Sequence, residues 1–283
     1  MNRAVSIHLG VSQPLDRRRE RVDRSDTAAW QMAELACQAG YDSVLVLRGQ
    51  EATLDAVHTA LTRLSPTLEQ GDVLLVTYSG HGGQVRDKMD DAEDRDPDGF
   101  DETWCLYDGD LVDDRLSAYW QLFNPGVRIV VVSESCYGAG MGRTSYGCAR
   151  PVLVSQPERR ARSASAPGDV DAASATATGA CMIAPSRITD RIRASVLLLT
   201  AAAESQEAPS GILTELLVEL WDSGRCPHTY AELYQRLNQR MMGSGYSSHL
   251  LMLGTADEEF PTLPAFHRPR GGGARRNGGY RSR

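Results

Sequence analysis

The chain has 283 residues, of which 41% are hydrophobic and 24% are charged, with a formal net charge of −7 at pH 7. This length accommodates one large α/β domain or two small ones, and the negative charge argues against a nucleic-acid-binding core. No stretch approaches the roughly 18 apolar residues that a membrane-spanning helix needs, and the apolar stretch at the start is too short for a secretory signal. The six cysteines show neither metal-binding nor disulfide spacing, which suits a reducing compartment. We therefore expect a cytoplasmic protein.

The hydrophobic pattern of the first part of the chain alternates between strands and helices. Helix 27–39 is expected to turn Trp30, Ala33, Leu35 and Ala36 to one side. Such alternation predicts an α/β fold with a mostly parallel central sheet and helices on both faces. The predicted strands are 4–10, 41–47, 73–78 and 126–133, and the other predicted helices are 51–64 and 113–123.

The pattern is lost between about residues 138 and 193, where the chain is rich in Ala, Ser and Arg, and this predicts a mobile loop. Order resumes with strands 194–201 and 248–253 and with helices 211–221 and 229–242. The last helix begins with the capping box Thr229 and Glu232. We expect one domain over residues 1–263, followed by a disordered, basic Gly/Arg-rich tail over residues 264–283. That tail is either solubilising or a contact for nucleic acid or anionic lipid.

Two apolar strands end in small polar turns that carry reactive side chains. The strand at 73–78 leads into Y-S-G-H-G-G-Q with His81, and the strand at 126–133 leads into S-E-S-C-Y-G with Cys136. Catalytic groups collect at the carboxyl ends of parallel strands, which lie only about 4.8 Å apart when they are neighbours. The pattern therefore predicts an imidazole base beside a thiol nucleophile. The alternative is that Cys136 is a buried structural thiol.

Side-chain alternation along a strand predicts which groups flank this pair. Ser79 should project with His81, and Glu134 should project with Cys136. A carboxylate beside a thiol raises the pKa of the thiol, so Glu134 needs a purpose other than activating Cys136. The backbone N–H groups of Gly82 and Cys136 are the natural donors to an oxyanion.

The blocks Y-S-G-H-G-G-Q, D-G-F-D-E-T and S-E-S-C-Y-G together resemble the metacaspase and orthocaspase branch of the caspase-like cysteine peptidases. The resemblance covers roughly residues 3 to 255, and a histidine about 50 residues before the cysteine is the caspase spacing. It implies a caspase-like fold and a cysteine endopeptidase. His81 would be the general base and acid, and Cys136 the nucleophile.

The resemblance also implies a pocket for a basic side chain at P1, the substrate residue before the cleaved bond. Family members usually carry Asp two positions before the cysteine, where this chain has Glu134, and Ser79 matches the pocket serine. The family's N-D-A loop corresponds to R-S-D-T-A, so Asp26 is the third pocket candidate, with Asp23 as the alternative. The Q-A-C-R-G block of Asp-directed caspases is absent, and we expect cleavage after Arg or Lys. The alternative for Glu134 is a solvated carboxylate at the sheet edge.

Calcium is a further implication of the resemblance, because the family carries an acidic segment at the position of residues 87–102. Dense oxygen donors suit calcium, which takes about six to eight oxygen ligands. The spacing is not that of an EF-hand, and the family's acidic ligand shortly after the cysteine is missing. Solvated charge is the alternative, or Asp101 and Glu102 hold the geometry of the loop. The candidate ligands are Asp98, Asp101, Asp113 and Asp114.

An enzyme that cuts after Arg and carries an Arg-rich loop can process itself there, as family members do in the corresponding linker; plain disorder is the alternative. The candidate sites are Arg143, Arg150, Arg159, Arg160 and Arg162. We expect a monomer that acts on protein or peptide substrates. Two other functions remain open: a catalytically silent caspase-like interaction module, and a thiol hydrolase acting on non-peptide amides or esters. The remaining histidines, His8, His58, His228, His249 and His267, receive no role.

Overall fold

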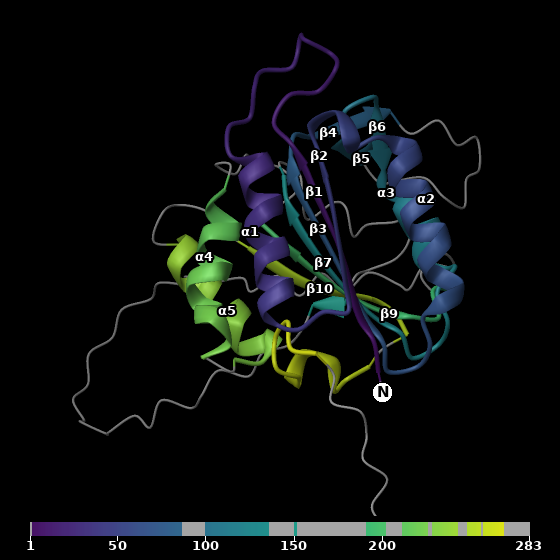
Figure 1. Cartoon of the computed structure of the whole chain (residues 1–283), viewed down its shortest axis with the longest axis vertical. Coiled ribbons are helices and arrows are strands. Elements are labelled where there is room, and N and C mark those ends of the chain that lie inside the picture. The colour runs from purple at the N-terminus through teal and green to yellow at the C-terminus, as the bar shows by residue number, and fades with distance from the viewer. Residues whose placement is uncertain are drawn as a thin grey trace, which may run out of the picture.

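A seven-stranded sheet forms the centre of the protein (Figure 1). The computed structural model describes residues 2–86, 100–135, 150–151, 191–201, 211–225, 228–242, 248–255 and 257–268. Over these residues the strand order is β2-β1-β3-β7-β9-β10-β8. The strands are β1 (Ala4–Val11), β2 (Ser43–Arg48), β3 (Val73–Gly80), β7 (Arg128–Glu134), β8 (Arg150–Pro151), β9 (Ser195–Thr200) and β10 (His249–Gly254).

The sheet is mostly parallel, as the sequence predicts. Strands β2, β1, β3, β7 and β9 run in the same direction, whereas β10 is antiparallel to β9 and β8 is antiparallel to β10. Every residue of β1, β3 and β9 is buried, because helices cover both faces of a parallel sheet. Strand β8 lies inside the segment expected to be a mobile loop. That expectation is wrong for residues 150–151, because their backbone pairs with β10.

The helices divide between the two faces of the sheet (Figure 1). Helices α1 (Ser25–Gln38), α4 (Ile212–Trp221) and α5 (Tyr230–Met242) pack on one face. Helices α2 (Leu54–Leu64) and α3 (Asp113–Trp120) pack on the other. None of the helices in the described part of the chain is long and apolar enough to cross a membrane.

A second, antiparallel sheet was not predicted from the sequence. It consists of β4 (Gly82–Arg86), β5 (Phe100–Cys105) and β6 (Asp110–Val112), in that order. The acidic segment expected at 87–102 therefore ends in a strand at residues 100–102, while residues 87–99 lie outside the described ranges. Strand β5 was not predicted because it contains Asp101 and Glu102, which are buried, and acidic residues are depleted in strands.

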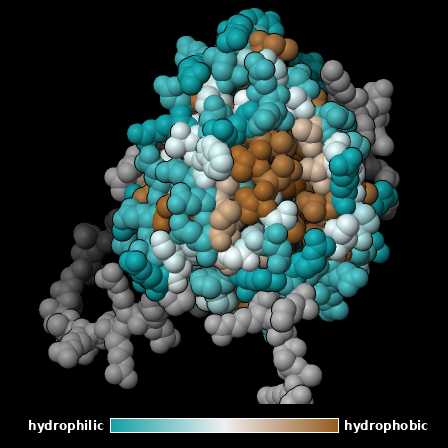
Figure 2. Space-filling view, in the orientation of Figure 1, coloured by the Kyte–Doolittle hydropathy of each residue, from teal (hydrophilic) through white to brown (hydrophobic). Residues whose placement is uncertain are grey.

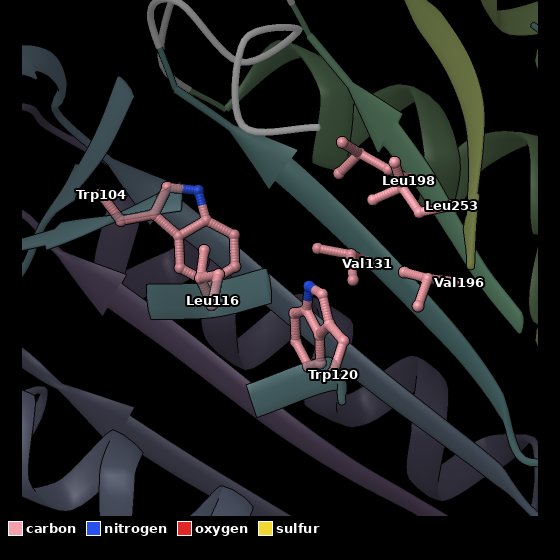
Figure 3. Close-up of a pocket in the computed structure, with 7 residues that line it drawn as sticks. All are labelled: Trp104, Leu116, Trp120, Val131, Val196, Leu198 and Leu253. Atoms are coloured by element: carbon pink, nitrogen blue, oxygen red, sulfur yellow. The ribbon is translucent and has the colours of Figure 1, made fainter. Parts of the chain in front are cut away.

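Trp104 packs this small sheet against the central sheet. Its ring stacks on Tyr78 of β3 with 4.8 Å between centroids, and its indole N–H donates to Ser133 Oγ of β7 at 2.9 Å. It also lines a small cavity with Leu116 and Trp120 of α3 and with side chains of β7, β9 and β10 (Figure 3). The lining side chains are aliphatic or tryptophan, so the cavity lacks the convergent polar groups that orient a ligand. We interpret it as a packing gap in the core.

Two local expectations are corrected and one is confirmed. Trp30 does not face the core: its side chain is 52% exposed, and the Arg48 guanidinium lies 4.9 Å from its ring centroid. The packed chain also continues past residue 263, because Phe266 is buried with an edge-to-face contact to Tyr230. The capping box of α5 is confirmed by the reciprocal hydrogen bonds of Thr229 and Glu232.

Strand β2 is an edge of the central sheet, with only β1 paired to it in the part of the chain described. Leu45 is 39% exposed and its apolar neighbours Val44, Val46 and Leu47 are half-buried. Figure 2 shows a hydrophobic patch between α1 and α2, in the region where Figure 1 places the strands. The edge strand thus contributes apolar surface to this side of the molecule.

Gly10 allows α1 to approach β1 closely, and its replacement by alanine should destabilise the fold. An added Cβ would lie 2.5 Å from the Ser25 carbonyl oxygen and 2.9 Å from Ala29 Cβ. The Ser25 carbonyl belongs to the start of α1 and the Ala29 side chain is buried, so an added methyl group would overpack this contact. We expect the free energy of unfolding to fall by about 1–3 kcal/mol. Urea denaturation measures it. In the control, Gly109→Ala, the new Cβ would meet only the end of the Leu54 side chain at 3.0 Å, and an equal loss in both variants would contradict the prediction.

Candidate active site

His81 lies where the sequence places it, at the carboxyl end of β3 and directly before β4. Strand β3 pairs in parallel with β7, with Ser79 opposite Glu134. The two strands that lead to His81 and Cys136 are therefore neighbours that end at the same edge of the sheet. Ser135 is the last described residue before Cys136, which itself lies outside the described ranges.

The backbone and the ring of His81 are both held by hydrogen bonds. Its carbonyl oxygen accepts from the Tyr78 hydroxyl at 2.6 Å and from the Cys105 N–H at 3.0 Å. Its ring nitrogen Nε2 lies 2.6 Å from the Glu20 carbonyl oxygen, in the loop between β1 and α1. A carbonyl only accepts, so Nε2 carries a hydrogen, and in the neutral ring Nδ1 is then the proton acceptor. Sequence reasoning missed Glu20, because it contributes only a backbone carbonyl and no side-chain signal.

Glu134 is buried and its carboxylate receives four hydrogen bonds. Oε2 accepts from Ser79 Oγ at 3.2 Å and from Thr214 Oγ1 at 2.8 Å. Oε1 accepts from the backbone N–H groups of Leu213 at 2.7 Å and Thr214 at 3.3 Å. These donors fill about all the lone-pair positions of a carboxylate. The expected neighbourhood of Ser79 and Glu134 is thus observed.

The alternative that Glu134 is a solvated edge carboxylate is wrong, since the residue is only 3% exposed. Leu213 and Thr214 lie in the first turn of α4, whose unpaired N–H groups and positive dipole end favour an acceptor there. Burial raises the pKa of Glu134, and the hydrogen bonds from Thr214, Leu213 and Ser79 oppose that shift. No local sequence pattern links Glu134 to a helix that begins nearly 80 residues later.

Asp26 lies in the first turn of α1 and is half-buried. Its Oδ1 accepts from the Ser12 N–H at 3.4 Å, while Ser12 Oγ accepts from the Asp26 N–H at 3.2 Å. Gly10 pairs with Ser79 in the sheet, and a Cβ on Gly10 would lie 2.9 Å from Asp26 Cα. Asp26 therefore lies at the same sheet edge as Ser79, although these hydrogen bonds go to Ser12. The alternative, Asp23, forms an exposed ion pair with Arg21.

The candidate calcium ligands do not form a site by themselves. Asp101 of β5 and Asp113 of α3 are buried, Asp114 follows in the same helical turn, and Asp98 lies outside the described ranges. Across the residues that the structure describes, no group of three or more His, Cys, Asp or Glu side chains is arranged to hold a metal ion. We therefore assign no chemical step to calcium.

The remaining sequence candidates are placed as follows. Gly82, a proposed oxyanion donor, is the first residue of β4. Arg150 lies in β8, whereas Arg143, Arg159, Arg160 and Arg162 lie outside the described residues.

Another cysteine and another histidine near this edge, Cys105 and His8, are buried. Burial raises the pKa of Cys105 to about 12, so it is a neutral thiol near pH 7 and a poor nucleophile. Burial lowers the pKa of His8 to about 3, and its ring contacts Thr77 Oγ1 and Ser6 Oγ, both at 2.9 Å. These two residues belong to the core.

Comparisons with known proteins show what this chain is similar to. The family described as "Metacaspase, peptidase C14 domain" matches residues 32–143, a range that includes His81, Glu134 and Cys136. Metacaspase-4 of Arabidopsis thaliana is 37% identical over 86 residues, which are 30% of this chain and 20% of the relative. Metacaspase-1A of Neurospora crassa is 28% identical over 112 residues, which are 38% and 24%. The match thus spans about a quarter or less of each curated relative.

The fold is similar over nearly the whole chain to two solved structures. A crystal structure of a Geobacter sulfurreducens protein has a TM-score of 0.68 and 22% identity, and covers 94% of this chain and 99% of that one. Caspase-1 of Spodoptera frugiperda has a TM-score of 0.52 and 10% identity, and covers 95% and 92%. The predicted caspase-like fold is therefore confirmed. Residues 32–143 are thus similar to the metacaspase peptidase domain, and the fold of the chain is caspase-like.

Proposed function

We propose that this protein is a cysteine endopeptidase that cleaves after Arg or Lys, with Cys136 as the nucleophile and His81 as the general base and acid. The observation that carries the proposal is the fixed His81 ring. Its Nε2–H is held by the Glu20 carbonyl, at the end of the strand next to the one that leads to Cys136. A nucleophile, a base and a third group that orients the base are the parts that acyl transfer needs.

The reaction begins when Nδ1 of His81 takes the proton of the Cys136 thiol. The thiolate attacks the carbonyl carbon, and the N–H groups of Gly82 and Cys136 stabilise the oxyanion. His81 then gives its proton to the departing amine, which leaves a thioester on Cys136. Water, deprotonated by His81, attacks the thioester and releases the carboxylic acid and the free thiol. The hydrogen bond to Glu20 keeps Nε2 protonated throughout, so that Nδ1 carries out each transfer.

Preference for a basic P1 side chain rests on Glu134, Ser79 and Asp26. The first two are in contact on the face of the sheet that α1 and α4 cover. A P1 guanidinium that reaches Glu134 must replace one of its four present donors. The hydroxyls of Ser79 and Thr214 can rotate away, whereas the two backbone N–H groups of α4 cannot without unwinding the helix start. We therefore expect the P1 cation to approach from the Oε2 side.

Fluorogenic peptides ending in Arg, Lys or Asp test the activity. We expect cleavage after Arg and Lys and none after Asp, and we expect Cys136→Ala and His81→Ala each to lose activity by more than about a thousandfold. Calcium and EDTA are compared in the same assay, because the acidic candidates Asp98, Asp101, Asp113 and Asp114 carry the oxygen donors that calcium takes. Cleavage that Cys136→Ala leaves intact, or an absence of Arg and Lys cleavage in both arms, would contradict the proposal.

Self-processing is the second prediction. We expect a fresh preparation of the wild type to contain fragments cut after an Arg between residues 143 and 193, and Cys136→Ala to remain whole. Intact-mass measurement identifies the cut. A whole wild-type chain after incubation under conditions in which it cleaves peptides would contradict self-processing and leave the peptidase proposal standing.

Glu134→Gln tests the basic P1 preference. The change keeps the shape and removes the charge, so we expect kcat/KM for the Arg peptide to fall by about tenfold to a hundredfold, the worth of a charge-assisted hydrogen bond. The matched control is Glu215→Gln on the same helix, because that carboxylate is about half exposed and pairs with Arg24. Equal kinetics in wild type and Glu134→Gln would remove Glu134 from the P1 pocket.

The same variant yields a pH prediction for stability. Because burial raises the pKa of Glu134 above its ordinary value of 4.5, the folded state holds this proton more tightly than the unfolded state does. The resulting stabilisation is complete below pH 4.5 and is lost as the pH rises through the folded pKa. We expect the unfolding free energy of the wild type, relative to Glu134→Gln, to decrease as the pH rises above 4.5. A difference that increases with pH would show that the four hydrogen bonds outweigh burial.

A further inference from the structure

We propose that Arg19 is a positioning residue for His81. It holds the loop between β1 and α1 against the small sheet, so that the Glu20 carbonyl meets the imidazole. The inference rests on the proposed function only for its catalytic consequence. The structural part, that Arg19 orients the ring, stands on contacts alone.

The guanidinium of Arg19 joins the loop to the sheet that follows His81. Its Nη2 donates to Asp110 Oδ2 at 2.8 Å, and its Nη1 contacts Cys105 Sγ. Asp110 is the first residue of β6, and Cys105 is the last residue of β5. The Cys105 N–H also donates to the His81 carbonyl. Arg19 therefore binds to the same small sheet that fixes the His81 backbone, one residue before the carbonyl that fixes the His81 ring.

The ion pair of Arg19 with Asp110 is partly buried next to Gly83. The side chains of Arg19 and Asp110 are 31% and 26% exposed, so the pair is partly shielded from solvent. A Cβ on Gly83 would lie 3.4 Å from Cys105 Sγ and 3.7 Å from Arg19 Nη1. Gly83, two residues after His81, therefore lies beside the guanidinium of Arg19.

Two other arginines of the same loop, Arg18 and Arg21, serve as controls. Arg18 pairs with Asp16 and Arg21 pairs with Asp23, each two residues away within the loop itself. Their side chains are 91% and 62% exposed. Exposed local pairs contribute little and do not connect the loop to the small sheet. The ion pair of Arg19 with Asp110, in contrast, connects the loop to the small sheet.

Loss of the Arg19 contact should release the Glu20 carbonyl from the ring. The imidazole would then lose its fixed orientation, and misplacing a catalytic group by about 1 Å can cost up to a hundredfold in rate. We therefore expect Arg19→Ala to lower kcat by about tenfold to a hundredfold with little change in KM, because the loop contact affects proton transfer more than ground-state binding. Arg19→Lys, which keeps the charge beside Asp110, should recover part of the rate.

Proton and nitrogen NMR of the full chain gives a readout that does not depend on activity. In Cys136→Ala protein, we expect His81 to show a downfield Hε2 signal from its hydrogen bond to Glu20, assigned by its absence in His81→Ala. Adding Arg19→Ala or Asp110→Asn should broaden or remove this signal. Adding Arg18→Ala or Arg21→Ala should leave it unchanged.

The outcomes separate this inference from the proposed function. If the wild type cleaves no peptide, the peptidase proposal fails, and the His81 signal still decides whether Arg19 orients the ring. An unchanged signal in Arg19→Ala overturns the inference, as does an equal change in Arg18→Ala and Arg21→Ala. The double variant Arg19→Ala/Asp110→Asn should lose no more rate than Arg19→Ala alone, since both changes break one contact; additive losses would contradict a shared role. If Arg19→Ala does not fold, Asp110→Asn and Arg19→Lys supply the same comparison.

Discussion

The parallel pairing of β3 with β7 is the constraint on which the rest of the structure depends. It places Ser79 opposite Glu134 and makes the turns after both strands leave at one edge of the sheet. The apolar sequences of the two strands, buried on both faces, leave little freedom of register, because a shift by one residue would turn Ser79 and Glu134 to the other face.

Around this pairing, two backbone contacts from distant parts of the chain complete the site. The Glu20 carbonyl comes from the loop before α1 and reaches the His81 ring, while the first turn of α4 donates to Glu134. Both contacts close onto the same sheet edge, one from the N-terminal part and one from the C-terminal part. Glu134 thus joins the strand that leads to Cys136 to a helix of the second half. In the proposed P1 pocket, binding of a basic side chain to Glu134 would therefore be coupled to a change at the start of α4.

The sequence alone predicted the central sheet, its mostly parallel order and the neighbouring ends of the two key strands. It succeeded there because runs such as V-L-L-V-T-Y and R-I-V-V-V-S carry strong local signals. Period-two alternation along the strands predicted that Ser79 and Glu134 would flank the same pair of turns, and their direct hydrogen bond is a finding of the structure. These inferences depend on residues within one strand or on the general geometry of parallel sheets.

Other features depend on contacts that no local pattern encodes. The strand Phe100–Cys105 contains acidic residues, and its burial comes from Trp104 stacking on Tyr78. Trp30 was expected inside because of its apolar ring, but Arg48 of β2 covers it at the surface. The partner of His81 is a backbone carbonyl, for which the identity of residue 20 carries no signal. Each of these outcomes was set by tertiary packing.

The central claim is that His81 activates Cys136 beside a pocket for a basic side chain. Covalent labelling by a peptidyl ketone that carries Arg at P1, followed by peptide mass spectrometry, tests it most directly. The account predicts one adduct, on Cys136, formed rapidly in the wild type, slowly in His81→Ala, and slowly with the matching Asp reagent. An adduct on Cys37 or Cys105 instead, or equal labelling rates with and without His81, would contradict it.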